Sequence, residues 1–318
     1  MELPMKRLRK LKSVLGLAGI ILIAILASPV AADGSNIFLQ AGNLTDVLRQ
    51  MSVIGIIAVA MTFVILTAGI DLSVGSILAF ATCLTGMFIT RSSPGSSHFA
   101  QAALAVTVAV GASALVGAAN GVVISAFRIQ PFIVSLASMI GVRGLAKWLS
   151  KNENIDIGFG SDAAASFAGF VNQKVVIVGA FAVLAAIFWI VLDRTVFGRY
   201  VRAIGDNEKA GRYSGLPIRS VKIAVYTLSG LLTGIAGVLY AAENHQGNPN
   251  AGVAYELDAI AAVVIGGTSL RGGSGSIAGT IVGTLIMGGL RNVLRLRNVD
   301  SNVERRVKGV SMVLAVAI

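Results

Sequence analysis

The stretch Ala68-Gly-Ile-Asp-Leu-Ser-Val-Gly-Ser76 decides how this chain folds, because it places a charge inside a long apolar region. Asp71 is the only charged residue between Arg49 and Arg91. A carboxylate at membrane depth costs about 2.5–3.5 kcal/mol on insertion scales, so it is rarely present there without a use. A glycine on each side of Asp71 favours a break in the helix. The stretch therefore predicts a broken transmembrane helix and, as a first hypothesis, transport across a membrane.

The composition of the whole chain also indicates a membrane protein. Of its 318 residues, 55% are hydrophobic and 13% are charged, whereas a soluble domain has about 25% charged residues. Glycine is abundant, at 37 residues, and proline is sparse, at 6, which is typical of closely packed membrane helices. We expect an all-α, polytopic membrane protein of about eight to ten transmembrane helices, at least one of them broken. Residues 1–318 form a single transmembrane domain in this interpretation.

Charge and cysteine content argue against other classes. The net charge of +11 does not indicate nucleic-acid binding, because the basic residues cluster at the ends of apolar segments, where membrane topology requires them. The single cysteine, Cys83, lies in an apolar run and permits neither a disulfide framework nor a cysteine-rich metal site. His98 and His245 lie in expected loops without a cluster of ligands around them, so we expect no metal and no cofactor.

The candidate spans are apolar segments near the length of about 20 residues that a helix needs to cross a bilayer. The segment 131–149 contains Arg143 and Lys147, and it fits a partial or tilted span. Glycines interrupt 256–290, which leaves open whether it is two spans or one broken span. The last apolar stretch, 309–318, is too short to cross. The candidates are 14–27, 51–68, 74–90, 99–124, 131–149, 175–192, 223–240, 256–271 and 275–290.

The N-terminus fits two interpretations. Five basic residues between positions 6 and 12 precede the first apolar run, and Val30-Ala31-Ala32 resembles a small-residue cleavage site. A cleaved signal peptide and an uncleaved first span both have this pattern. We favour the uncleaved span, with its N-terminus in the cytoplasm, because many more spans follow. Residues 33–46, which contain two Asp and no Lys or Arg, then lie outside.

The loop 193–222 is the second informative region. It holds seven Lys or Arg residues and three Asp or Glu residues, so 7 − 3 gives +4, and the positive-inside rule places it in the cytoplasm. The loop 241–255, with Glu243 and no Lys or Arg, is expected outside. Residues 197–210 fit one or two short amphipathic helices with glycines as breaks. The residues alone leave two interpretations, a solvated basic loop near anionic lipid or a docking surface for a cytoplasmic subunit.

Strings spread along residues 45–295 form an ordered pattern. They are Ala68 to Ser76, Asn120-Gly121, Pro131-Phe-Ile-Val-Ser-Leu136, Ala203-x-Gly205-x-Asn207-x-x-Ala210, Glu256-Leu-Asp-Ala-Ile260, and Gly266-Gly-Thr-Ser-Leu270 to Gly279. In this order they resemble the permease subunits of bacterial sugar-importing ABC transporters, of the ribose, xylose, arabinose and galactose type. Arg271 departs from the pattern, because a small or uncharged residue is expected there. The chain also stops earlier than such permeases usually do.

The resemblance implies a permease of the bacterial inner membrane that works with a second permease subunit, identical or different. It implies a cytoplasmic ATP-binding subunit and an extracytoplasmic binding protein that delivers a monosaccharide. The chain contains no Gly-Lys dipeptide, and therefore lacks the phosphate-binding string of ATPases, so we expect no enzyme activity in it. The loop 193–222 becomes the expected coupling element, with the residues Arg199, Gly205, Asn207, Ala210 and Gly215.

Two roles for Asp71 stay open. Near the translocation pathway it could accept hydrogen bonds from sugar hydroxyls, with Ser73 and Ser76 adding hydroxyls and Phe132 as a further candidate. Alternatively, it caps the helix that begins near residue 72 or 73, where a carboxylate also suits the helix dipole. We favour the cap, because it needs no unseen partner, and the two roles are compatible.

Small and amide side chains predict close helix contacts. Asn120 lies in a charge-free span, and we expect an interhelical hydrogen bond more than a ligand contact. Gly117 and Gly121 have the spacing that lets another helix approach closely. Three further glycines repeat every fourth residue and predict one tightly packed helix face: Gly275, Gly279 and Gly283.

Two alternative functions remain. An ion-coupled secondary transporter would use Asp71 to carry a proton or Na⁺ and would need no ATPase. An ABC permease could also carry another small polar solute, such as a nucleoside, a branched-chain amino acid or an autoinducer. The sequence does not identify the sugar.

Overall fold

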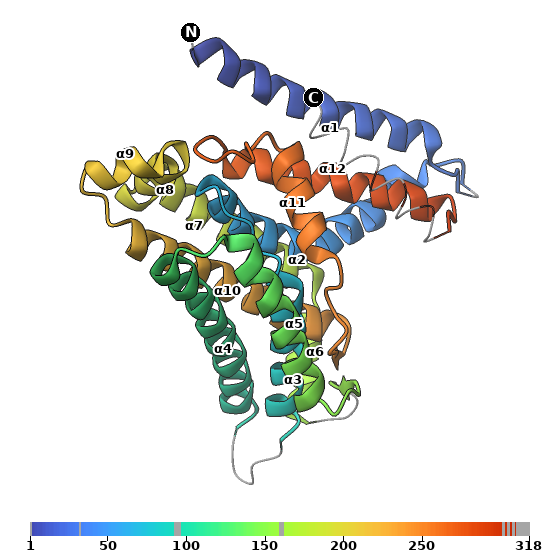
Figure 1. Cartoon of the computed structure of the whole chain (residues 1–318). Helices are drawn as coiled ribbons and strands as arrows, with labels where there is room; N and C mark the ends of the chain where they lie inside the picture. Colours follow the sequence, from blue (N-terminus) through green and yellow to red (C-terminus); the bar gives the residue numbers. More distant parts are fainter. Residues whose placement is uncertain are drawn as a thin grey trace.

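The computed structural model describes residues 2–31, 33–91, 97–158 and 162–300, together with Val303, Arg306 and Gly309. The apolar stretch 309–318 lies outside this part apart from Gly309, and so does Ala32 of the possible cleavage site. The regular secondary structure of the described residues is almost wholly helical (Figure 1). Its elements are α1 (Glu2–Ala27), η1 (Ile37–Leu39), α2 (Ala41–Leu66), α3 (Val74–Ile89), α4 (His98–Phe127), α5 (Pro131–Leu149), β1 (Ile155–Asp156), α6 (Ala163–Val171), α7 (Lys174–Arg194), α8 (Val196–Asp206), α9 (Glu208–Tyr213), α10 (Ile218–Glu243), β2 (Gln246–Gly247), α11 (Tyr255–Ile265) and α12 (Ile277–Leu296).

The expectation of an all-α, polytopic membrane protein is confirmed. Six of the described helices are long and apolar enough to cross a membrane, namely α2, α4, α5, α7, α10 and α12. Two shorter apolar helices, Leu15–Ala27 within α1 and α3, accompany them. The charged segment 131–149 is one continuous helix, α5. The break at Asp71 is present as well, because α2 ends at Leu66 and α3 begins at Val74.

The segment 256–290 consists of a short helix followed by a long one. With 11 residues, α11 is about 16 Å long at 1.5 Å per residue, roughly half of the hydrocarbon core. With 20 residues, α12 is long enough to span it. The C-terminal end of α12 lies beside the start of α2, since Asn292 donates to Asn43 at 2.8 Å and Arg295 donates to Gln50 at 2.8 Å. The segment is therefore a half-span that packs against a full span.

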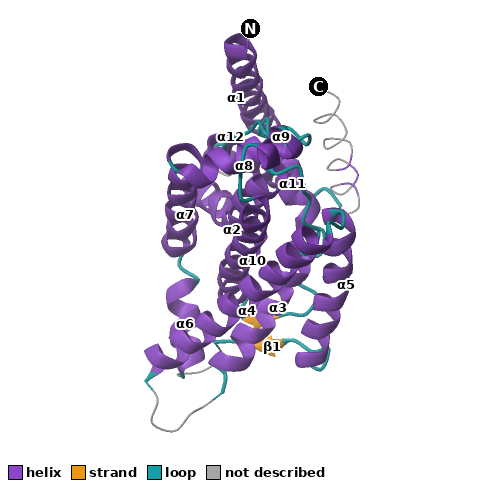
Figure 2. Ribbon diagram, turned by 60° about the vertical axis from the view of Figure 1, so that its left-hand side comes forward, coloured by secondary structure: helices purple, strands orange, loops and turns teal. Residues whose placement is uncertain are grey.

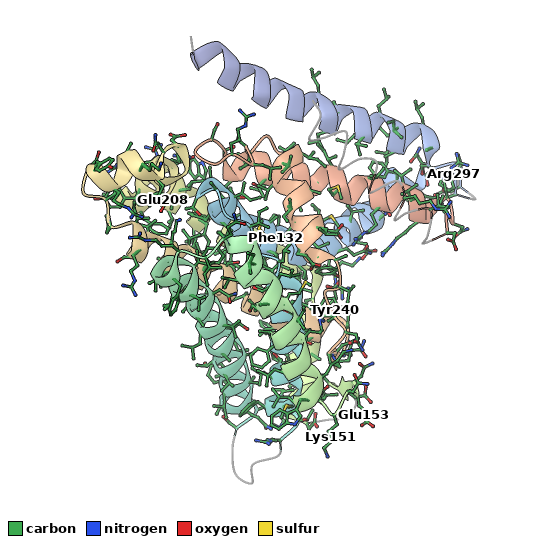
Figure 3. All side chains as sticks on the ribbon, in the orientation of Figure 1. Phe132, Lys151, Glu153, Glu208, Tyr240 and Arg297 are labelled. Atoms are coloured by element: carbon green, nitrogen blue, oxygen red, sulfur yellow. The ribbon has the colours of Figure 1, made fainter. Side chains whose placement is uncertain are left out.

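The bundle has two distinct ends. Helices α8 and α9 lie at one end, and β1 and α6 lie at the other (Figure 2). Figure 3 shows the same separation in side chains, with Glu208 of α9 at one end and Lys151 and Glu153, after α5, at the other. The expected cytoplasmic loop 193–222 is thus mostly helical, and it covers one end of the bundle as α8 and α9.

Helix α10 lies at the centre of the bundle and packs closely against α4. Gly117 and Gly121 of α4 face the backbone of α10, where a Cβ atom on Gly117 would lie 2.2 Å from the carbonyl oxygen of Tyr226. From the opposite side, a Cβ atom on Gly230 would lie 2.2 Å from the carbonyl oxygen of Ser113. Small residues on both helices therefore allow backbone contact, and they fix how α10 is placed against the break at Asp71.

Candidate functional site

The break between α2 and α3 is a short non-helical segment inside the bundle. The chain leaves α2 through Ala68, whose φ of 57° is left-handed, and the amide of Gly69 donates to the carbonyl of Val64 at 3.1 Å. A Cβ atom on Gly69 would lie 2.6 Å from the hydroxyl of Tyr226, so a side chain there would have to displace the buried Tyr226. The segment 67–73 is therefore held against α10 as it turns towards α3.

Asp71 is completely buried and accepts three hydrogen bonds. The backbone amide and the hydroxyl of Ser73 donate to Oδ1 at 3.0 and 2.5 Å, and the hydroxyl of Ser229 donates to Oδ2 at 2.7 Å. Ser229 lies near the middle of α10, so the carboxyl group is at membrane depth. The three donors replace the water that a carboxyl group would lose on burial. The amide that Asp71 accepts from belongs to Ser73, the N-cap residue directly before α3. Ser73 itself makes no side-chain cap bond.

Three further side chains fasten the same break to its neighbours. Asn120 of α4 donates to the hydroxyl of Ser73 at 3.1 Å. Ser135 of α5 and Tyr226 of α10 donate to the carbonyl of Ile70 at 3.2 and 3.4 Å. The break is thus joined to α4, α5 and α10 by a buried polar cluster, which we call the Asp71 cluster: Ile70, Asp71, Ser73, Asn120, Ser135, Tyr226 and Ser229.

Two further candidates for the pathway or the broken helix, Ser76 and Phe132, are not members of the Asp71 cluster. Ser76 is buried within α3, and its hydroxyl donates to the carbonyl of Ser73 at 2.8 Å. Phe132 lies on the first turn of α5, and its side chain is 50% exposed (Figure 3). Sequence reasoning missed Ser135, Tyr226 and Ser229. Their signal was a polar group inside an apolar span, and two of them are three residues apart on α10, a spacing that shares a helix face.

The loop between α11 and α12, residues 266–276, is the second break in helical structure, and backbone contacts hold the two helices together beside it. A Cβ atom on Gly279 would lie 2.1 Å from the carbonyl oxygen of Gly266, and one on Gly283 would lie 1.9 Å from that of Ala262. The expectation that Gly275 shares this helix face needs correction. Gly275 precedes α12 and packs against Thr268 in the connecting loop, because α12 begins only at Ile277.

The two helices of the expected coupling loop are capped by their own side chains. Thr195 accepts from the amide of Gly198 at 3.3 Å and starts α8, and Asn207 accepts from the amide of Ala210 at 3.0 Å and starts α9. Gly215, with φ of 76°, follows α9 in the left-handed conformation that glycine adopts without strain. Arg199 is exposed on α8. Asn207 and Ala210 therefore define the turn between the helices.

Gly205, near the end of α8, joins this loop to both helix breaks. A Cβ atom on Gly205 would lie 1.7 Å from the carbonyl oxygen of Leu66 and 2.5 Å from the amide nitrogen of Gly273. That amide donates to the carbonyl of Leu66 at 3.0 Å. The end of α2, the α11–α12 loop and α8 thus meet at one backbone junction. Any side chain at position 205 would push the three segments apart.

Neither histidine belongs to a cluster of metal-binding side chains within the described ranges. His98 lies 3.3 Å from the hydroxyl of Ser166, and His245 lies 3.0 Å from the amide group of Asn172. Arg271, which departs from the expected pattern, is exposed in the α11–α12 loop.

Comparison with known proteins identifies the family. A sequence model of the family described as "Branched-chain amino acid transport system / permease component" matches residues 43–316. The chain is 40% identical to a ribose import permease protein of Bacillus subtilis over 97% of this chain and 92% of the relative. It is 42% identical to the ribose import permease protein of Escherichia coli K12, over 94% and 92%. A fructose import permease protein of Rhizobium meliloti is 36% identical, over 94% and 83%.

No solved structure matches the chain. The matches to sugar-import permeases over nearly the whole chain agree with the sugar-transport resemblance of the sequence. The chain therefore belongs to this family of transport-system permease components, and the relatives compared with it are sugar-import permeases.

Proposed function

We propose that this chain is the membrane-spanning permease subunit of an ATP-driven importer for a monosaccharide, with ribose as the first candidate. Identity of 40–42% to ribose import permeases over nearly the whole length favours ribose. In the structure, the observation that carries the proposal is the junction at Gly205. A loop at one end of the bundle touches both breaks in the membrane-spanning part, as a coupling element for an external motor must.

The partners follow from this division of labour. A separate ATP-binding subunit docks on α8 and α9, because Gly205 of α8 contacts both breaks. A second permease subunit, identical or different, completes the membrane part. A substrate-binding protein delivers the sugar at the opposite end. The protein is a multi-pass protein of the bacterial inner membrane.

The N-terminus is cytoplasmic in this proposal. With α8 and α9 in the cytoplasm, α2 descends from outside and α12 ends outside. The basic residues at the end of α12 then lie outside, as an exception to the positive-inside rule. Two of these basic residues interact with side chains of the same chain: Arg291 pairs with Asp258 at 2.8 Å, and Arg295 donates to Gln50 at 2.8 Å.

The path of the sugar is proposed to lie along α3, α5 and α11 and not through the Asp71 cluster, which has no exposed carboxylate. A non-helical segment, 248–254, runs along α3, because the hydroxyl of Thr82 donates to the carbonyl of Asn248 at 3.0 Å and Gly252 packs against Gly75. Such backbone is tolerated at membrane depth where it is buried or lines a water-filled path. Arg143 of α5 donates to the carbonyls of Pro249 and Ala251 at 2.9 and 2.5 Å. Arg143 and Glu256 are both half-buried and ionisable, so they can meet a polar solute. Asp71 instead fixes the break.

Sealed vesicles that contain the chain with its ATP-binding and substrate-binding partners test the proposal. We expect ribose uptake to depend on ATP and to survive an ionophore that removes proton and Na⁺ gradients. Uptake that needs an ion gradient and no ATP would support the secondary transporter instead. ATP-driven uptake of a nucleoside or amino acid, without ribose uptake, would keep the ATP-driven class and reject the sugar.

A further inference from the structure

A groove of about 650 Å³ opens at the α8–α9 end of the bundle. It lies where the end of α4 meets the first residues of α5 and α10, and α9 borders one side. Four basic side chains and one acidic side chain line it, so 4 − 1 gives a local charge of +3. These residues are Arg128, Glu208, Arg212, Arg219 and Lys222.

Only part of this charge is neutralised within the groove. Glu208 pairs with Lys222 at 2.7 Å and with Arg212 at 3.3 Å. Across the described ranges, no ion pair involves Arg128 or Arg219, and both side chains are exposed. The groove therefore presents two guanidinium groups to an anion from outside the chain. Guanidinium groups bind phosphate with two parallel hydrogen bonds, which suits them to a phosphate group.

Two helix starts reinforce the preference for an anion. Helix α5 begins at Pro131 and α10 at Ile218, and neither has a side-chain cap. The residues before them, Gln130 and Pro217, also line the groove. The positive ends of both helix dipoles thus add to the field of the guanidinium groups.

The position of the groove and its apolar flank favour a lipid over a protein segment. Helices α4, α5 and α10 are candidate spans, so their ends at the groove lie near the membrane surface. Ile129 lines the groove, and the neighbouring Phe127 and Phe132 are 71% and 50% exposed. An acidic protein segment would match the charge, but exposed Phe rings beside the ends of spans match the boundary between headgroups and acyl chains.

We propose that this groove binds the phosphate headgroup of an anionic phospholipid, with an acyl chain against Phe127 and Phe132. Arg128 and Arg219 hold the phosphate, and the pairing of Glu208 with Lys222 and Arg212 fixes α9 as one wall. The proposal depends on the groove and not on the transported solute, so it can fail without affecting the proposed function.

The test measures the thermal stability of the full-length chain in detergent as phosphatidylglycerol is added. Zwitterionic phosphatidylcholine and inorganic phosphate serve as comparison ligands. The double variant Arg128→Gln/Arg219→Gln removes the two free cations. A matched double variant, Arg194→Gln/Lys209→Gln, removes the same charge from the same end of the bundle but outside the groove. The variant Arg128→Lys/Arg219→Lys keeps both charges and checks folding.

We expect phosphatidylglycerol to stabilise the wild type and the matched variant, and the other two ligands to have little effect. The Gln variant should need about 25-fold more phosphatidylglycerol, at roughly fivefold per basic side chain, while the Lys variant stays close to the wild type. Equal stabilisation of all variants would overturn the proposal, and so would an equal effect of phosphatidylcholine or of inorganic phosphate. If the Gln variant lost binding to the ATP-binding subunit while the lipid effect stayed unchanged, the groove would be a protein-docking surface instead.

Discussion

The two helix breaks of this protein are built in different ways. The break between α2 and α3 is held by side chains, with Asp71 accepting from Ser73 and Ser229 and with hydrogen bonds from three neighbouring helices. The break between α11 and α12 is held by backbone, where Gly266 meets Gly279. The first break depends on partners for buried polar groups, and the second depends on the absence of side chains. Gly205 of α8 contacts both breaks, so a displacement of α8 would act on both of them.

The largest effect is expected from Asp71→Ala. It leaves the amide and hydroxyl of Ser73 and the hydroxyl of Ser229 without their acceptor in a fully buried site, at about 1–3 kcal/mol for each unsatisfied group. We expect little folded protein, measured by size-exclusion chromatography and thermal unfolding in detergent. Asp71→Asn keeps one acceptor oxygen and should lose less. If the Ala variant were as stable as the wild type, the cluster would not hold the break.

The glycine break is tested by Gly283→Ala. The new methyl group would lie 1.9 Å from the carbonyl oxygen of Ala262, so α11 and α12 must separate, and overpacking of this kind costs about 1–3 kcal/mol. We expect a lower melting temperature of the purified protein. Gly111→Ala in α4 is the control, because no atom lies within 4 Å of its Cβ position, and it should be neutral or stabilising. Equal behaviour of the two variants would mean that α11 and α12 are not in close contact.

Gly205→Ala tests the junction between the two breaks. The added methyl group meets the carbonyl oxygen of Leu66 at 1.7 Å and must displace the junction. We expect sugar-stimulated ATP hydrolysis to fall by about tenfold, which corresponds to about 1.4 kcal/mol, while the ATP-binding subunit still associates. Gly211→Ala on α9 is the matched control, because its nearest neighbour is the flexible side chain of Leu216 at 3.2 Å. Normal stimulation in the Gly205 variant would contradict a coupling role.

The smallest effect is expected from Asn207→Ala. Loss of the N-cap bond to Ala210 should destabilise α9 by about 1 kcal/mol and raise hydrogen exchange of its amides about fivefold. Asn207→Asp keeps the acceptor and should exchange like the wild type. The breaks themselves should stay protected in both variants. Faster exchange at α3 in the Ala variant would mean that the cap reaches further than the junction geometry predicts.

The sequence predicted the membrane class and the first break, because a lone charge and long apolar runs are local signals. It could not predict the partners of that charge, since Ser229 lies 158 positions away from Asp71. The face formed by Gly279 and Gly283 was visible as a repeat in the sequence. Gly275 was wrongly added to this face, because the four-residue spacing extends into the loop before α12 begins at Ile277. The meeting of Gly205 with Leu66 has no sequence signal. Two backbones that touch leave no side-chain pattern to read.

The burial of Cys83 has a practical consequence. The only cysteine of the chain has no exposed surface and lies within α3, so water-soluble thiol reagents should not react with the folded wild-type protein. Any single cysteine added by mutation would then report by itself which side of the membrane it faces. The exposed Asn298, two residues after the end of α12, and the exposed Tyr213, on α9, are suitable positions for such reporters, because the proposed topology places the first outside and the second in the cytoplasm. The wild-type chain can therefore be used without removal of Cys83 when thiol labelling maps its orientation in living cells.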